Sequence, residues 1–334
     1  MAYQNVGVPR FYIDHGLWLY SSEEFIPPAD QISLFQLNPS NVVVRPVDTI
    51  QIPRVCPMRY CAFLGHKGNA AFYNDWSDGT TWAGAWYSGY EEIINAPAPS
   101  VANGVLPDYS GFSISTFDDN ATHPYLRAII NYANAPAGSP LPTIGAVSMG
   151  NFYDMPNAPN LSLTMSREYG GTKEFTTHNG SSMSNTMWSK PAQWGDLPAW
   201  ALSEGGGFSS SDVWNMAASG RRSWDLKFSY MADSDVFPMF STLGAEESWH
   251  ASGDDFWDWF NTWHIGETIL DSDNFYSQVW HKTLGGTLPF IFQPDNSNNN
   301  PDQFCIAKFK DNSLKATQSA HNVYDISLSI EEVW

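Results

Sequence analysis

Alternation of apolar and polar residues recurs in several segments of this chain and constrains its fold more than any other feature. Successive side chains of a β-strand point to opposite faces of its sheet, so a period of two predicts a half-buried strand. We therefore predict strands over residues 161–166, 222–230 and 324–331. The faces expected to point inward consist of Leu161, Leu163 and Met165, of Arg222, Trp224, Leu226, Phe228 and Tyr230, and of Tyr324, Ile326, Leu328 and Ile330.

Proline punctuates the first sixty residues, at positions 9, 27, 28, 39, 46, 53 and 57. Each proline fixes its own φ and disfavours helix in the residue before it, so we expect almost no helix in this region. Between the prolines, Gln31–Leu37 and Val42–Val44 are predicted to be sandwich strands. Further along, Tyr125–Tyr132 is apolar on both faces apart from Arg127 and Asn131, which predicts a central strand.

A loop of small residues, Ala133–Pro140, leads into a glycine-rich strand that begins near Gly145. We place a domain boundary there. Residues 1–144 are predicted to form a β-sandwich of jelly-roll type, and residues 145–334 a second β-rich domain with one or two short helices. The fold class expected for the whole chain is therefore mainly β.

Two short helices are expected in the second half. One should start near Val236, capped by the run Asp233–Asp235. The other is expected near 274–284, with Asp271 or Asp273 as its cap and the pair Gly285-Gly286 ending it in the left-handed conformation.

Composition points to a protein with extensive interfaces. Aromatic residues make up 15% of the chain, which includes 15 tryptophans, while only 15% of residues are charged. Such a chain has much apolar surface to bury, and we expect a homo-oligomer. The segment around residue 260 has more large aromatic side chains than one helix face can bury. We therefore predict that Trp257, Trp259 and Trp263 lie at a subunit interface.

The formal net charge of −19 argues against a nucleic-acid partner, because such a surface repels phosphates. The sequence has no apolar run of about 18 residues to cross a bilayer. Its first residues, Met1–Val6, lack the basic and apolar regions of a signal peptide. We therefore expect neither a membrane span nor a secretory leader.

The three cysteines, Cys56, Cys61 and Cys305, leave one without a possible disulfide partner. Buried free thiols, assembled in a reducing cytoplasm, are the expected state. Cys56 and Cys61 resemble half of a zinc site, but only the isolated His66 follows them, where a second Cys or His pair is needed. We predict no metal and no cofactor.

Catalytic motifs are incomplete throughout the chain. The glycines at 205–207 are not followed by the Lys-Ser/Thr of a phosphate-binding loop. Residues 271–274 resemble the start of a calcium-binding loop, but Tyr276 and Lys282 stand where that loop needs Gly and Glu. We therefore predict no enzyme and no catalytic residue. A glycan hydrolase remains an alternative, since paired acids can come from any part of a fold. Its candidate acids are Asp118, Asp119, Asp254, Asp255 and Asp258.

A second alternative is a carbohydrate-binding module for host attachment. The segment 69–90 is rich in Gly, Trp and Tyr, and aromatic rings flanked by carboxylates can stack on sugars. The candidate glycan contacts are Trp76, Trp82 and Trp86. Packing of these rings beneath long loops is the competing interpretation.

Residues 145–334 resemble the ring-forming domain of tailed-phage distal-tail and minor-tail proteins. The resemblance rests on four motifs in order: Ile144–Pro156, Arg221–Tyr230, Leu288–Asp295, and the closing Leu-Ser-Ile-Glu-Glu-Val-Trp. It implies a virion structural protein assembled in the host cytoplasm. In that family six copies form a ring that joins the tail tube to the hub, tip or fibre proteins. The N-terminal region is an addition to the family's usual length.

Overall fold

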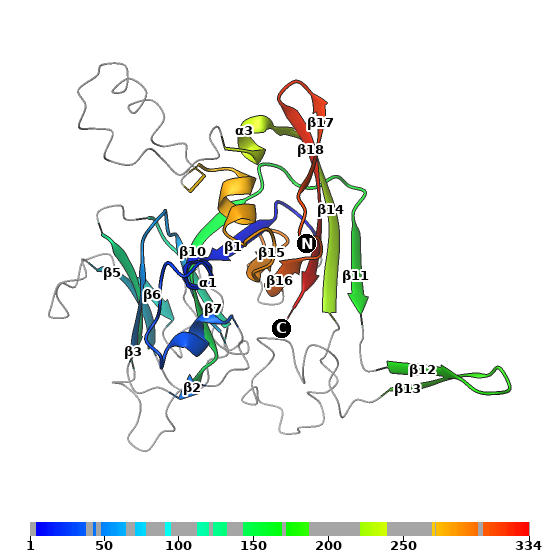
Figure 1. The fold of residues 1–334 in the computed structure, drawn as a ribbon, viewed down its shortest axis with the longest axis horizontal. Coiled ribbons are helices and arrows are strands. Elements are labelled where there is room, and N and C mark those ends of the chain that lie inside the picture. Colours follow the sequence, from blue (N-terminus) through cyan, green and yellow to red (C-terminus); the bar gives the residue numbers. More distant parts are fainter. Residues whose placement is uncertain are drawn as a thin grey trace.

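The computed structural model describes residues 5–37, 43–44, 48–64, 71–77, 91–94, 112–119, 123–131, 143–168, 172–186, 221–238, 269–270, 272–299 and 303–333. In these residues the chain is mainly β, as predicted, and every strand pairing is antiparallel. A large sheet, a smaller sheet that lies beside it and a projecting hairpin are the main parts (Figure 1). None of the helices in the described residues is long and apolar enough to span a bilayer.

The large sheet has ten strands. Nine follow one path, and β17 (Lys315–Ala320) is added to it by pairing with β18. In spatial order the path consists of β11 (Thr164–Glu168), β14 (Arg221–Ala232), β18 (Val323–Glu332), β16 (Cys305–Phe309), β15 (Phe290–Gln293), β1 (Arg10–Asp14), β10 (Ala146–Asp154), β4 (Tyr60–Leu64) and β7 (Phe112–Thr116).

The large sheet continues across the predicted boundary at residues 144 and 145. Strand β1 pairs with β10 on one side and with β15 on the other, and β10 also pairs with β4. Strands from both halves of the sequence therefore alternate within one hydrogen-bonded sheet. The division predicted from the loop at 133–140 does not separate the two halves into two sheets.

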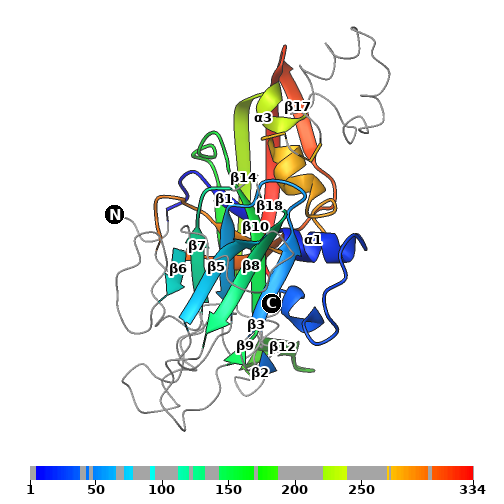
Figure 2. The same ribbon diagram turned by 90° about the vertical axis from the view of Figure 1, so that its left-hand side faces the viewer.

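The smaller sheet has four strands and packs against one end of the large sheet. Its order is β3 (Asp48–Pro53), β8 (Tyr125–Asn131), β5 (Ala71–Ser77) and β6 (Glu91–Ile94), so β8 is central as predicted. Figure 2 shows this sheet facing the viewer. Ile50 and Leu126 from it share an apolar cluster with Phe63 and Val147 of the large sheet. This face-to-face packing is sandwich-like. A two-stranded ladder, β2 (Val43–Val44) with β9 (Thr143–Ile144), adds to the strands.

The expectation of almost no helix in the first sixty residues is wrong at two places. Helix α1 (His15–Ser21) begins after Asp14, whose carboxylate accepts a hydrogen bond of 3.0 Å from the N–H of Leu17. A capping carboxylate of this kind satisfies a donor at the helix start. The segment Gln31–Leu37, predicted as a strand, contains the 3-10 helix η1 (Ile32–Phe35). Adjacent Leu34 and Phe35 are both buried, which a helical turn allows and an alternating strand does not.

The two helices expected in the second half are present with different starts. Helix α3 (Asp233–Val236) includes Asp233 and Asp235 in its first turn, and neither caps it. The helix predicted near 274–284 is confirmed as the π-helix η3 (Tyr276–His281). Before it, Asn274 accepts a hydrogen bond of 2.8 Å from the N–H of Ser277. Gly285 and Gly286 follow with φ of +70° and +83°, as predicted.

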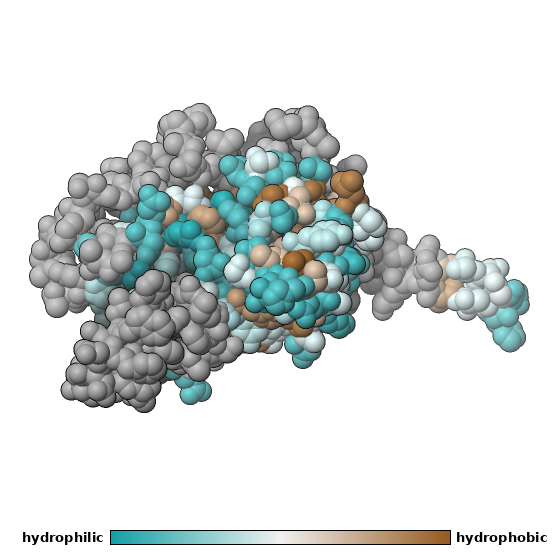
Figure 3. Space-filling model, turned by 90° about the horizontal axis from the view of Figure 1, so that it is seen from above, coloured by the Kyte–Doolittle hydropathy of each residue, from teal (hydrophilic) through white to brown (hydrophobic). Residues whose placement is uncertain are grey.

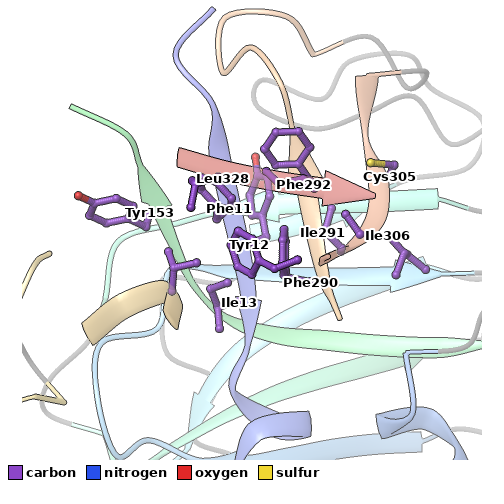
Figure 4. Close-up of a cluster of buried hydrophobic side chains, with 14 of the residues drawn as sticks. Phe11, Tyr12, Ile13, Tyr153, Phe290, Ile291, Phe292, Cys305, Ile306 and Leu328 are labelled. Carbon is purple, nitrogen blue, oxygen red and sulfur yellow. The ribbon is translucent and has the colours of Figure 1, made fainter. Parts of the chain in front are cut away.

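The main core lies between η3, α3 and the middle of the large sheet. Phe11 of β1 contacts the rings of Phe290 and Phe292 at centroid distances of 5.5 and 5.2 Å. Figure 4 shows how side chains from β1, β15, β16 and β18 meet in this cluster. The predicted inward faces of β14 and β18 are confirmed for Trp224, Leu226 and Phe228 and for Ile326, Leu328 and Ile330.

One residue of the predicted β14 face points outward instead. The pairing of β14 with β18 shifts between Phe228 and Met231, and Tyr230 within that irregularity has a φ of +61°. A bulge of this kind inserts an unpaired residue and exchanges the two faces. Tyr230 is consequently exposed, and Met231 is buried in its place.

Candidate functional site

A hairpin of two strands, β12 (Thr172–Thr176) and β13 (Ser182–Thr186), extends away from the rest of the protein. Among the described strands, β12 and β13 pair only with each other. We call residues 172–186 the arm. At its tip the N–H of Thr177 bonds to the carbonyl of Ser181 at 2.8 Å, and Gly180 has a φ of +79°. The sequence Asn179-Gly180 suits this turn, because both residue types tolerate positive φ.

The arm carries an exposed apolar pair. Phe175 of β12 lies directly opposite Met183 of β13, so both side chains point to the same face of the hairpin. Phe175 is 49% exposed and Met183 is 50% exposed. The space-filling view shows the arm extending to one side of the molecule (Figure 3). A two-stranded hairpin is marginally stable alone in water, and this one leaves its two large apolar side chains half uncovered.

A second exposed apolar group lies at the edge of the large sheet, beside β11. Leu161 is fully exposed and Met165 is nearly half exposed. Backbone and side-chain atoms of Asn160 hold this segment in place, through bonds of 2.8 Å to the carbonyl of Lys227 and 2.9 Å to Oγ of Ser229. The prediction that residues 161–166 form a half-buried strand is only partly correct, because β11 begins at Thr164 and its predicted inward face is largely open.

Polar side chains form a buried network between η3 and β10. Oε1 of Gln278 accepts hydrogen bonds from Nδ2 of Asn151 at 2.9 Å and from Nζ of Lys282 at 2.8 Å. Oδ1 of Asn151 in turn accepts a bond of 2.7 Å from Nε of Arg59. A buried polar group without its hydrogen-bond partner costs free energy, so the network favours one position of η3 against the large sheet.

Titratable groups at the junction of β1 and α1 are also buried. Burial raises the pKa of Asp14 to about 7. Burial, and then the charge of Lys282, holds the pKa of His15 well below 6.5, so its imidazole is neutral. Sγ of Cys56 lies 3.5 Å from Nδ1 of this ring. These groups are closed to solvent. We therefore expect the cluster to affect the free energy of unfolding of the protein.

The predicted glycan and hydrolase residues are placed as follows. Trp76 is 8% exposed and packs edge-on against Phe117, with the two ring centroids 6.0 Å apart. Its ring therefore has little free surface for stacking on a sugar. Asp119 forms an ion pair with Arg54 and accepts a bond of 2.9 Å from the N–H of Met58, whereas Asp118 is exposed. The other candidates lie outside the described residues: Trp82, Trp86, Asp254, Asp255 and Asp258.

The predicted interface residues Trp257, Trp259 and Trp263 also lie outside the described residues, as does His66. The three cysteines are free and buried, as predicted. In the part of the chain that the structure describes, no group of three His, Cys, Asp or Glu side chains is placed to hold a metal ion. The arm was missed from sequence, although Asn179-Gly180 between two Thr- and Ser-rich segments signals a hairpin.

Comparison of the chain with protein-family models, with curated proteins and with solved structures finds no match.

Proposed function

We propose that the chain is a structural protein of a phage tail. In this proposal several copies, with six the expected number, form a ring at the distal tail or tip. The ring joins the tail tube to the hub, tip or fibre proteins, and the protein is found in the virion tail. The four motifs between residues 144 and 334 that resemble distal-tail and minor-tail proteins support this function.

The observation that carries the proposal is the arm with its exposed pair, Phe175 and Met183. Apolar side chains left open on a projecting hairpin are typical of contacts that are completed by another molecule. A ring needs such a contact between two different patches of neighbouring copies, since identical patches would close a dimer. The arm is a separate two-stranded sheet, and the second exposed apolar group, Leu161 and Met165, lies at the edge of the large sheet.

Assembly in the host cytoplasm agrees with the state of the cysteines. Cys56, Cys61 and Cys305 are free thiols, and burial raises the pKa of both Cys61 and Cys305. Thiols of this kind persist in a reducing compartment without forming disulfides.

Light scattering of the purified protein at several concentrations, with negative-stain images of the same sample, tests the proposal. The expected result is a single oligomeric mass, six times that of the chain, and ring-shaped particles. A monomer at every concentration, with no ring in the images, would contradict it.

A further inference from the structure

We propose that the arm of one copy docks on the edge of the large sheet in a second copy of this chain, with Phe175 and Met183 packing against Leu161 and Met165. This inference rests on the proposed ring function, because it names the partner of the same arm. Each half of the contact is seen in the structure, and the pairing between copies is the new element.

Among the described residues of a single copy, neither half of the contact is covered. Phe175 and Met183 are half exposed on the arm, and Leu161 and Met165 are exposed beside β11. These four side chains are half of the eight large apolar residues exposed in the described part of the chain. Bringing them together covers both groups and removes apolar surface from water, which favours the contact.

The edge of the large sheet offers backbone groups as well as side chains. Strand β11 pairs with β14 on one side and, within the described residues, with no strand on the other. The strands of the arm likewise have outer edges without a described partner. A hairpin that meets such an edge can add its backbone hydrogen bonds to the sheet, and the apolar side chains then set the register.

Local charge favours a second copy as the partner, because both apolar groups lie in a stretch without net charge. The chain as a whole has a net charge of −19, so two copies repel each other on average. From Leu161 to Thr186, however, Arg167 and Lys173 balance Glu168 and Glu174. This stretch contains both the arm and the receiving edge. Contact between copies through it avoids the like-charge approach that costs free energy elsewhere.

Crosslinking between two variants, each with one added cysteine, tests the pairing. Met183→Cys places a thiol on the arm, and Met165→Cys places one on the receiving edge. The native thiols are all buried, so a short bismaleimide should react only at the new sites. The expected product in a mixture of the two variants is a covalent pair with twice the mass of the chain. Neither variant should give this product alone.

Ile26→Cys is the matched control, because Ile26 is exposed but lies outside the arm and the edge. Its mixture with Met183→Cys should give no pair. Formation of the pair by Met183→Cys alone would show that two arms meet each other, and would overturn the inference. So would the absence of a product in the main mixture.

The mass of each uncrosslinked sample separates this inference from the ring proposal. An oligomer without the crosslink overturns the docking contact and leaves the ring standing. A crosslinked pair in a sample that never exceeds two copies supports the docking contact and overturns the ring. A monomer without the crosslink overturns both.

Discussion

Nζ of Lys282 lies 2.8 Å from Oε1 of Gln278, and both side chains are closed to solvent. The same oxygen also accepts a bond from Nδ2 of Asn151. Gln278 is therefore the shared acceptor that joins η3 to β10.

Replacing Gln278 with Leu removes that acceptor from two buried donors. Since the loss of a shared acceptor from a buried network costs free energy, we expect the free energy of unfolding to fall by about 2–4 kcal/mol. Chemical denaturation measures this change. Gln318→Leu, at an exposed position of β17, serves as the control and should change it by less than about 0.5 kcal/mol. Equal effects of both variants would contradict the role of the network.

Asp14→Asn should remove a pH dependence of stability. The pKa of Asp14 is about 7 in the folded protein against 3.8 ordinarily, because the carboxyl is buried. Between these values the folded state holds a proton that the unfolded state has lost, so stability falls as pH rises through this window. The full loss is roughly 4 kcal/mol above pH 7. Asn also caps helices, so the variant keeps that function.

Denaturation of both proteins at pH 5 and pH 8 measures the effect. The advantage of the Asp14→Asn variant should grow by about 3 kcal/mol between the two pH values. His15 acts in the opposite direction, because its lowered pKa makes the folded state lose stability as pH falls below 6.5. The difference in unfolding free energy between the variant and the wild type at each pH isolates the contribution of Asp14. Parallel pH profiles would show that its carboxyl is not the source.

Glu332→Ala should destabilise the protein strongly, because it leaves Arg222 buried without its carboxylate. Nε and Nη2 of Arg222 each donate to that carboxylate at 3.1 Å, and both side chains are almost closed to solvent. The expected loss is about 3–5 kcal/mol of unfolding free energy. Lys315→Ala, which breaks the exposed pair with Asp311, should cost less than about 1 kcal/mol. A loss no larger than that of the control would contradict the importance of the buried pair.

All three native thiols should be unreactive toward an aromatic disulfide reagent while the protein is folded. Cys56, Cys61 and Cys305 are buried, and reaction requires an accessible thiolate. Three equivalents should react after unfolding. Ser182→Cys, on the exposed arm, should add one thiol that reacts as fast as free cysteine. Rapid reaction of a native thiol would show that the core opens more readily than its packing implies.

The alternating segments of β14 and β18 were predicted well, because their inward faces are decided locally. Leu328 and Ile330 lie where a period of two places them, and so do Trp224 and Leu226. The prediction that Tyr230 points inward was wrong. The bulge that turns it outward depends on the pairing with β18, which the sequence of β14 does not reveal. The buried polar side chains Gln278 and Lys282 were also not foreseen, since their partners are distant in the sequence.

The first helices, and the continuity of the large sheet across residue 144, were not predicted, for related reasons. Proline restricts the residues beside it, yet the proline-free stretch 10–26 leaves room for β1 and α1. Strand β1 lies between β10 and β15 because of tertiary pairing, so a loop at 133–140 could not indicate where the sheet ends. The turn of the arm could have been predicted from Asn179-Gly180. The exposure of the arm could not, because it depends on the position of the arm relative to the large sheet.

Native mass spectrometry of the wild type and of a variant with Phe175→Ser and Met183→Ser tests the central claim, assembly through the arm, most directly. The wild type should show one oligomeric mass, with six copies expected. The variant should be a folded monomer whose circular dichroism spectrum matches that of the wild type, since both side chains already lie half in solvent. A wild-type monomer, or a variant that assembles as the wild type does, would contradict the account.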